Sequence, residues 1–335
     1  MGYIYDDEGR ITGSETEDAF VVKSAGEVLR DDYGWEVIDE ESAPTPVKKK
    51  FRDPEASAAM PLFRTLTLDE LENLPDPEWI IDGYVPADAM VTVFGAPGST
   101  KSFWALDVAC SIAAGEKFNN ADVKKGKVIY CVGEGLRGMK WRIEAWKLAH
   151  PNADFAALAE NLVLLPRAVM LLDKTEAAML INTAESVHED DTLRAFIIDT
   201  WARSLTGGDE NSAQDVGVAI NICETVRAKT GASPIIIHHT GADGSRERGS
   251  TALRGATDTT IQMAHSETDG VVTVTCKKMK DGEPFPAVRY NLKPYGHSIV
   301  LEPVPTGGPY GTYVPPVRDK DYYIKKAQEK KDSPF

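Results

Sequence analysis

The stretch of residues 89–102 combines residue types that together bind phosphate. It reads AMVTVFGAPGSTKS: an apolar run, a turn of small residues, and then Lys101 and Ser102 at the start of a helical pattern. In such a turn the backbone N–H groups point into one concavity, where a lysine reaches the terminal phosphates of a nucleotide and the next hydroxyl holds Mg²⁺. We therefore expect ATP and Mg²⁺ to be bound by Gly95, Ala96, Pro97, Gly98, Ser99, Thr100, Lys101 and Ser102.

One residue of this loop departs from the phosphate-binding pattern G-x-x-x-x-G-K-[ST]. Thr100 takes the place of the second glycine. The turn can require a positive φ at that position, which costs a β-branched residue about 1 kcal/mol or more. We expect the loop to tolerate Thr100. A Gly-rich turn that binds no phosphate and a degenerate nucleotide-binding scaffold are the alternatives.

Hydrolysis of a nucleotide needs three more parts: an acid that holds the metal, a group that orients water, and positive charge for the transition state. Asp199 ends the apolar run AFIID, and we expect it to hold Mg²⁺ together with Ser102. Glu134 lies between two glycines just after the apolar run KVIYCV, and we expect it to polarise the attacking water. The structural alternatives are a helix N-cap for Asp199 and a turn carboxylate for Glu134.

Two adjacent histidines, His238 and His239, follow the apolar run PIII. Neighbouring residues of a strand point to opposite faces, so one of the two is expected to be structural. His239 is nearer to the loop that follows, and we expect it to sense the γ-phosphate and to signal its presence to that loop. A histidine of the core is the alternative.

The elements that must position these residues alternate between strand and helix patterns. Apolar, β-branched runs predict buried strands at residues 90–94, 127–132, 162–165, 193–199 and 234–238. Helical patterns lie at residues 103–114, 136–150, 176–188 and 211–229. Short strand patterns follow at residues 259–264, 271–277, 287–292 and 298–301. We expect an α/β fold: a P-loop NTPase core with a mainly parallel sheet, helices on both faces and an antiparallel strand extension.

Composition divides the chain into three parts. Residues 1–60 are acidic and poor in large aliphatic side chains, and we expect a mostly flexible leader with one short helix near residues 17–29. Residues 61–305 are expected to form the ATPase domain, and residues 306–335 a Pro/Gly-rich and charged tail. Thr67 and Glu70 have the spacing of a capping box, which predicts a helix within residues 66–74.

The distribution of charge decides whether a nucleic-acid partner is compatible with this composition. The formal net charge is −15, which taken alone argues against such a partner. Residues 1–41 contain thirteen acidic and three basic residues, a net charge of −10, so residues 42–335 carry only −5. A local basic lining is therefore possible in the body of the protein.

Neither a membrane span nor a metal-binding cysteine pattern is found in the sequence. No run of 18 apolar residues exists, and the acidic N-terminus lacks the apolar segment of a secretory signal, so we expect a cytoplasmic protein with no membrane partner. The cysteines are far apart and form no CxxC pair. We expect them to be buried as small hydrophobic residues: Cys110, Cys131, Cys223 and Cys276.

Taken together, these motifs resemble those of the RecA-like ATPases of the hexameric-helicase branch, particularly the RepA replicative helicases of plasmid and phage type. The resemblance covers about residues 79–290. It rests on motifs in a fixed order: residues 95–102, 134–135, 197–204 with 208–212, 238–241, 248–254 and 278–282. It implies a RecA-like fold, ATP-driven helicase activity on single-stranded DNA in replication, and a homo-oligomeric ring of six subunits with ATP bound between neighbours.

The resemblance also implies roles for basic residues. Family members use a basic pair just before a turn to reach the γ-phosphate on the next subunit, and Lys278 and Lys280 match its spacing. One face of a strand would carry both side chains. Arg248 is a further candidate for this catalytic role, and solvated surface charge is the alternative for all three.

Residues 241–249 correspond to the central DNA-binding loop of such rings, where Ser245, Arg246 and Arg248 can contact phosphates. The acidic leader is then a candidate docking segment for a replication partner, with a solvated tail as the simpler interpretation.

Two other activities remain open at this point. A recombination ATPase of the RecA/RadA type shares most of these residues but forms filaments instead of closed rings. A P-loop phosphotransferase acting on a small molecule would need an acceptor site, and it would gain nothing from Lys278 and Lys280.

Overall fold

A computed structural model describes residues 3–5, 11–14, 65–74, 77–189, 192–241 and 246–305. The chain divides into two units, Met1–Glu72 and Asn73–Phe335, and each is described by itself. The first unit contains an antiparallel strand pair that the sequence analysis did not anticipate, β1 (Tyr3–Tyr5) and β2 (Ile11–Ser14). Most of the predicted leader, including the helix expected near residues 17–29, and all of the tail beyond residue 305 lie outside the described residues.

The helix expected at the end of the first unit is α1 (Leu68–Glu72). The Thr67 N–H donates to Glu70 Oε2 at 2.8 Å, and the Glu70 N–H donates to Thr67 Oγ1 at 3.2 Å. These reciprocal bonds satisfy backbone donors that the first helical turn leaves free. The predicted capping box is therefore confirmed.

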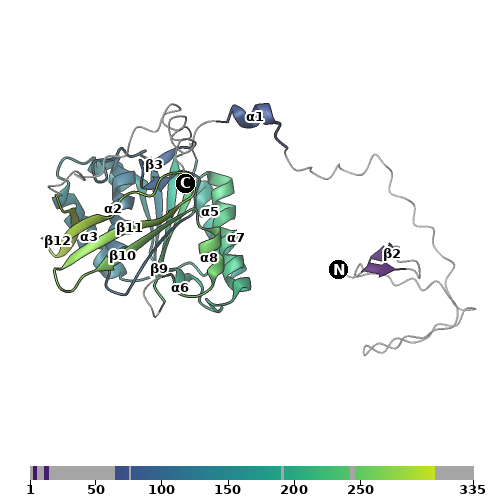
Figure 1. The fold of residues 1–335 in the computed structure, drawn as a ribbon. Helices are drawn as coiled ribbons and strands as arrows, with labels where there is room; N and C mark the ends of the chain where they lie inside the picture. Colours follow the sequence, from purple (N-terminus) through teal and green to yellow (C-terminus); the bar gives the residue numbers. More distant parts are fainter. Residues whose placement is uncertain are drawn as a thin grey trace, which may run out of the picture. The chain divides into compact units, whose positions relative to one another are not determined.

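Within the described residues, the second unit is built on a nine-stranded sheet (Figure 1). Its parallel part contains, in spatial order, β10 (Thr259–His265), β5 (Val91–Gly95), β9 (Ser233–His239), β8 (Leu193–Asp199), β6 (Lys127–Val132) and β7 (Leu162–Leu165). Antiparallel strands extend it beyond β10: β11 (Val271–Met279), β12 (Val288–Tyr295) and β13 (Ser298–Pro303). A separate pair, β3 (Trp79–Ile81) and β4 (Val85–Pro86), precedes β5. The predicted fold class, a RecA-like P-loop NTPase core with an antiparallel extension, is confirmed.

Helices cover both faces of this sheet (Figure 1). One face packs against α2 (Lys101–Ala114), α3 (Leu136–Ala149) and α4 (Phe155–Asn161). The other packs against α5 (Lys174–Val187), α6 (Trp201–Ser204), α7 (Ala213–Thr230) and α8 (Thr251–Ala256). Because the central parallel strands β5, β9, β8 and β6 are buried on both faces, their sequences read as continuous apolar runs. The helices α4, α6 and α8 were not expected from the sequence, because each is too short to show a helical period.

The two cores show which side of each strand faces which helices. Ile197 and Ile237 pack in the core that contains α2, whereas Ile198 and Ile236 pack in the core that contains α7. Continuing this alternation to the strand ends places Asp199 and His239 on the face of α2, and His238 on the face of α7.

Burial of the cysteines agrees with the sequence analysis, since all four are buried and free. Within the described residues, no helix combines the length and the apolar character that a membrane crossing requires.

Candidate functional site

The loop 95–102 joins the end of β5 to the start of α2 in the middle of the sheet. Gly95 pairs with His239 on one side and with Met263 on the other. A Cβ atom on Gly95 would lie 2.3 Å from the Met263 carbonyl oxygen and 2.5 Å from Ser99 Oγ. Since atoms do not approach that closely, glycine is required here. The strand–turn–helix context of a phosphate-binding loop is therefore present.

Thr100 adopts the left-handed conformation, with φ 63° and ψ 22°. Gly98 in the same turn also has a positive φ, 80°. The left-handed region costs a residue with a Cβ about 1–2 kcal/mol. The Thr100 hydroxyl donates to the Ser99 carbonyl oxygen at 2.7 Å. The turn thus has the geometry that favours glycine, and Thr100 occupies it under strain.

Lys101 is buried beneath the loop and is only 5% exposed. Its Nζ donates to the carbonyl oxygens of Gly95 and Ala96, each at 2.9 Å. Burial lowers the pKa of Lys101 to about 8, although the negative charges of Asp199 and Glu134 act to raise it. The ammonium is therefore mostly charged at neutral pH, and nucleotide phosphates can replace the loop carbonyls as its partners.

Asp199 ends β8 and is 2% exposed. The Tyr130 hydroxyl donates to Asp199 Oδ2 at 2.7 Å, whereas Oδ1 is buried without a hydrogen-bond partner among the described residues. Burial raises the pKa of this carboxyl, and hydrogen bonding by Tyr130 and Ser102 opposes that rise. A buried carboxylate oxygen that lacks a partner, beside a serine hydroxyl, is a hard-oxygen donor set of the kind that Mg²⁺ prefers. Ser102 and Asp199 therefore fit the ion.

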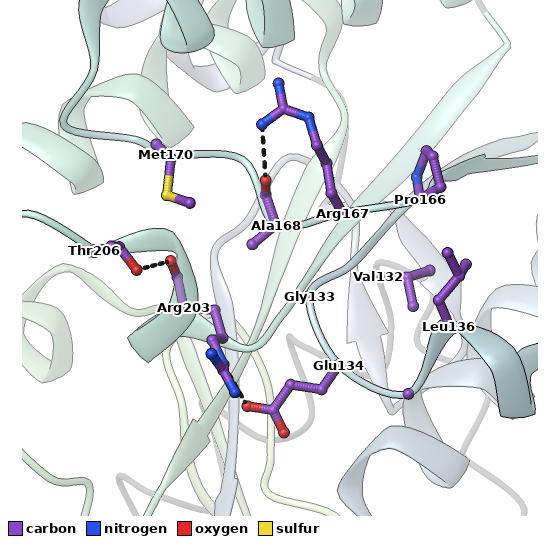
Figure 2. A pocket seen from close by; sticks show the side chains of 11 residues that line it. Val132, Gly133, Glu134, Leu136, Pro166, Arg167, Ala168, Met170, Arg203 and Thr206 are labelled. Carbon is purple, nitrogen blue, oxygen red and sulfur yellow. Dashed lines mark hydrogen bonds and ion pairs between the residues drawn. The ribbon is translucent and has the colours of Figure 1, made fainter.

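Glu134 follows β6 and lines a pocket at the ends of β6, β7 and β8 (Figure 2). Arg203 Nε donates to Glu134 Oε1 at 3.1 Å, and both side chains remain about half exposed. The pocket has a volume of about 430 Å³, and Arg167 also lines it. The negative charge of Glu134 raises the pKa of Lys101 and of His239, although burial lowers both by more. Glu134 is therefore near the loop 95–102, but its carboxylate is engaged by Arg203.

The two histidines have different surroundings. His238 is 1% exposed, and its Nε2 lies 2.7 Å from the Arg248 carbonyl oxygen. Burial lowers the pKa of His238 to about 4. His239 Nδ1 is buried with no hydrogen-bond partner in the part of the chain that the structure describes. Burial lowers the pKa of His239, and the positive charges of Lys101 and Arg248 lower it further. His238 Nδ1 is likewise buried without a partner among the described residues, so the two histidines differ in that His238 also contacts backbone through Nε2, whereas His239 lies beside the charges of Lys101 and Arg248.

Arg248 is held by a carboxylate of its own chain. Its Nε lies 2.6 Å from Glu210 Oε1, and a second guanidinium nitrogen donates to Glu210 Oε2 at 3.0 Å. The Arg248 N–H donates to the His239 carbonyl oxygen at 2.9 Å. A two-point pair of this kind fixes the guanidinium, so Arg248 must leave Glu210 before it can contact a phosphate. Of the predicted DNA-binding loop, residues 242–245, which include Ser245, lie outside the described residues.

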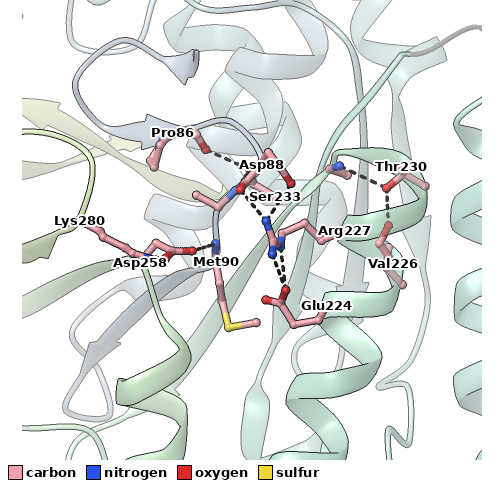
Figure 3. A network of polar contacts seen from close by, with 12 residues as sticks. Pro86, Asp88, Met90, Glu224, Val226, Arg227, Thr230, Ser233, Asp258 and Lys280 are labelled. Carbon is pink, nitrogen blue, oxygen red and sulfur yellow. Dashed lines mark hydrogen bonds and ion pairs between the residues drawn. The ribbon is translucent and has the colours of Figure 1, made fainter. Parts of the chain in front are cut away.

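Lys278 and Lys280 lie near the amino ends of the parallel strands, whereas the loop 95–102 follows the carboxyl end of β5. Lys280 Nζ is 3.3 Å from Asp258 Oδ1, and Asp258 Oδ2 accepts the Met90 N–H at 3.0 Å (Figure 3). Lys278 Nζ donates to backbone carbonyl oxygens at the end of α8. The strand from Met90 to Gly95 spans about 16 Å at about 3.3 Å per residue. The lysine pair therefore does not reach the phosphate-binding loop of its own chain.

A family model described as an AAA domain matches residues 54–245, more than half of the chain. The chain belongs to this AAA-domain family of P-loop ATPases. The match covers the loop 95–102, Glu134, Asp199 and His239, and it ends before Arg248 and the two lysines. Nucleotide binding and ATPase activity are therefore properties of the family, while the roles of individual residues stay predictions. A search of curated proteins returned no match.

Three residues near the site of this AAA-domain ATPase were given no role from the sequence: Tyr130, Arg142 and Arg203. Tyr130 lies two residues before the end of β6, and its alternation with Val132 could have shown that it faces α2. The Arg142 guanidinium lies 4.6 Å from the centre of the Phe103 ring, and its charge acts on Asp199. The pairing of Arg203 with a residue 69 positions away has no local sequence pattern.

Proposed function

We propose that this ATPase is a DNA helicase of the RepA type, which translocates on single-stranded DNA in replication as a ring of six subunits. The observation that supports the proposal is the distance between the phosphate-binding loop and the lysine pair Lys278 and Lys280. The carboxyl ends of the parallel strands carry Lys101, Ser102, Asp199 and Glu134. Their amino ends lie near Lys278 and Lys280. A basic pair that cannot serve its own phosphate-binding loop is suited to the loop of a neighbouring subunit.

The chemistry assigned to the site is attack of water on the γ-phosphorus of ATP. Glu134 accepts the proton of the attacking water as the new P–O bond forms, and the bond from the γ-phosphorus to the bridging oxygen breaks. The products are ADP and inorganic phosphate. Lys101 moves from the loop carbonyls to the phosphates. Ser102 and Asp199 would hold Mg²⁺, which when bound would supply positive charge against the phosphates.

Coupling of hydrolysis to DNA is assigned to His239 and the loop after it. His239 lies on the face of the sheet that packs against α2, as the loop 95–102 leads into α2, and its backbone carbonyl accepts the Arg248 N–H. A change at the γ-phosphate that moves His239 would therefore reach Arg248 through this hydrogen bond. In a ring, six copies of that segment would concentrate positive charge in one channel.

ATP hydrolysis with and without an oligo(dT) strand, at low and at moderate salt, tests the proposal. Stimulation by DNA that weakens with salt is expected, since phosphate contacts release counterions. Lys101→Ala is the control and should abolish both basal and stimulated turnover. ATPase activity that DNA does not change at either salt concentration would argue against translocation.

The oligomeric part of the proposal has a separate test. Electron microscopy with a nonhydrolysable ATP analogue and DNA is expected to show closed six-membered rings. Filaments would favour a recombination ATPase, and a monomer at high concentration would favour a small-molecule phosphotransferase.

A further inference from the structure

The two lysines of the predicted basic pair have different partners within this chain. Lys278 is half-buried, and its Nζ donates to the carbonyl oxygens of Thr257 and, at 3.5 Å, of Arg254. The Lys280 side chain is 64% exposed, and its Nζ lies 3.3 Å from Asp258 Oδ1 (Figure 3). An exposed ion pair of this kind contributes little free energy. Lys280 can therefore leave its partner easily, whereas Lys278 would give up two acceptors.

The carbonyl oxygens that Lys278 contacts lie at the carboxyl end of α8. The last turn of a helix leaves carbonyl oxygens without partners inside the helix, and a lysine side chain can bond to them. The Thr257 hydroxyl adds a second contact there, since it donates to the Leu253 carbonyl oxygen at 2.7 Å and lies 2.8 Å from Thr92 Oγ1. Of the six residues of α8, all of which the structure describes, Leu253 alone is buried. A helix with so little buried surface depends on the contacts at its ends, so Lys278 fastens α8 to β11.

The amino end of α8 continues directly from the segment that carries Arg248. Ser250 caps the helix by accepting the Ala252 N–H at 3.2 Å, and its own N–H donates to the Glu210 carbonyl oxygen at 2.8 Å. Gly249 has φ 84°, and a Cβ atom there would lie 2.5 Å from the same Glu210 oxygen. The segment from Arg248 to Ser250 thus fits closely against Glu210, and a shift of α8 would disturb that fit.

We propose that the two lysines have different roles. Lys280 supplies positive charge to the nucleotide of the neighbouring subunit, whereas Lys278 stays within its own chain, where it holds α8 and thereby positions Arg248 for contact with DNA. Lys278 is in this view a positioning residue that acts through α8. The proposal rests on the proposed function, because it needs both a neighbouring subunit and a DNA strand.

The place of each lysine in the sheet supports this division. Lys278 pairs with Thr260 inside the antiparallel ladder of β10 and β11. Lys280 follows Met279, the last residue of β11, and its N–H donates to the Asp258 carbonyl oxygen at 3.0 Å. The lysine beyond the strand end, which also has the more exposed side chain, is the better placed of the two to extend toward a second chain.

Hydrogen exchange without DNA tests the contact between Lys278 and α8. In Lys278→Met, which removes the ammonium and keeps an unbranched side chain, the amides of residues 248–257 are expected to exchange about tenfold faster, as the loss of a charged hydrogen bond predicts. Lys278→Arg, which keeps a charged donor, should restore most of the protection. Lys293→Met is the matched control, because Lys293 pairs with Glu302 at 2.6 Å on β12 and its side chain is half exposed.

Turnover and DNA affinity test the division of roles. Without DNA, kcat in Lys280→Met is expected to fall at least about a hundredfold, as the loss of a charge that stabilises the transition state does. The fall in Lys278→Met should be at least about tenfold smaller than that in Lys280→Met. The affinity for oligo(dT), measured by fluorescence anisotropy with a nonhydrolysable ATP analogue at one salt concentration, should fall about fivefold in Lys278→Met, within the range of one hydrogen bond, and recover in Lys278→Arg.

The outcomes separate this inference from the proposed function. Unchanged exchange in a folded Lys278→Met, checked by thermal unfolding, overturns the fastening of α8. Faster exchange with unchanged affinity for oligo(dT) overturns the positioning of Arg248. Equal losses of kcat in the two lysine variants overturn the division of roles. A wild-type protein that binds no oligo(dT) overturns the proposed function and the DNA contact of Arg248 with it, while hydrogen exchange still decides whether Lys278 fastens α8.

Discussion

At the scale of single residues, the nucleotide site holds groups whose burial or backbone conformation is energetically unfavourable. Lys101 and Asp199 are buried charged groups, and Thr100 is a β-branched residue with φ 63°. Buried charge and left-handed backbone are both unfavourable unless partners or a ligand compensate. Phosphates beside Lys101 and a cation beside Asp199 would supply that compensation, so the strain of the site favours nucleotide binding.

Replacing Thr100 by glycine is expected to keep or raise the affinity for ATP. Relief of about 1–2 kcal/mol of backbone strain is partly offset by the larger entropy of glycine in the unfolded chain, about 0.5–1 kcal/mol. Calorimetric titration with a nonhydrolysable ATP analogue gives the affinity, and urea unfolding gives the stability. Thr100→Ala is the matched control, because it keeps the Cβ and most of the strain. A large loss of affinity in the glycine variant would show that the loop geometry is misread.

Replacing Tyr130 by phenylalanine is expected to lower the apparent affinity for Mg²⁺ about tenfold, as loss of a hydrogen-bond partner of a metal ligand commonly does. The Tyr130 hydroxyl donates to Asp199 Oδ2 at 2.7 Å, so its loss removes one of the hydrogen bonds that orient this carboxylate. The measurement is a Mg²⁺ titration of ATPase activity. Tyr290→Phe is the control, since Tyr290 is equally buried and its hydroxyl bonds to Asn119 instead. Identical Mg²⁺ titrations of the wild type and Tyr130→Phe would refute the role of Tyr130.

At the scale of elements, α2 is fastened to α3 by a buried polar contact. Trp146 Nε1 donates to Asp107 Oδ1 at 2.8 Å, and the Trp146 ring stacks on His150 at 4.3 Å. Burial raises the pKa of Asp107 to about 6, although the charge of His150 and the hydrogen bond from Trp146 act to lower it. Because α2 begins at Lys101, this contact supports the helix that follows the loop 95–102.

The pH dependence of stability is expected to differ between the wild type and Asp107→Asn. The Asp107 carboxyl has an ordinary pKa of 3.8 and a folded pKa of about 6, so the folded state binds more protons in between. The stability of the wild type should therefore fall, relative to the variant, as pH rises from about 4 to 7, by about 3 kcal/mol. Urea unfolding across that range measures the difference. Asparagine keeps an oxygen for Trp146, and parallel curves for the two proteins would disprove the titration of Asp107.

At the scale of the whole molecule, the loop 95–102 and the lysine pair lie at opposite ends of the parallel strands, and the proposed function makes each of them half of a site. The phosphate-binding loop lies at the carboxyl ends of the parallel strands, and the lysine pair lies near their amino ends. An interface that joins one kind of half-site to the other is heterologous, and such interfaces close into rings or extend into filaments.

Mixing two inactive variants is expected to restore ATPase activity. Lys101→Ala keeps the lysine pair, and the double variant Lys278→Ala with Lys280→Ala keeps the phosphate-binding loop. If sites form between chains, a random equal mixture should recover about a quarter of wild-type activity, because half of the loops are intact and half of those meet an intact pair. Activity of the mixture no higher than that of either variant would place the complete site within one chain.

The part of the site that the sequence could predict depends on local periodicity. The alternation along β8 and β9 orients Asp199 and His239 toward α2, and the turn before Lys101 has its residue types in order. Tertiary structure was needed wherever a contact joins distant segments. The pairing of Glu134 with Arg203, of Tyr130 with Asp199 and of Arg248 with Glu210 follows from strand order and loop paths, which no local pattern encodes.

By itself, the sequence determined the α/β core, the phosphate-binding loop and the strand ends where polar groups gather, because side-chain period and turn chemistry act over a few residues. Only the tertiary structure decided that Thr100 takes a positive φ and that Glu134 is engaged by Arg203. It also decided that Lys278 and Lys280 lie at the end of the strands opposite to the loop 95–102. The physical reason is that strand pairing brings together residues far apart in the chain, and the order β10-β5-β9-β8-β6 sets which strand ends become neighbours.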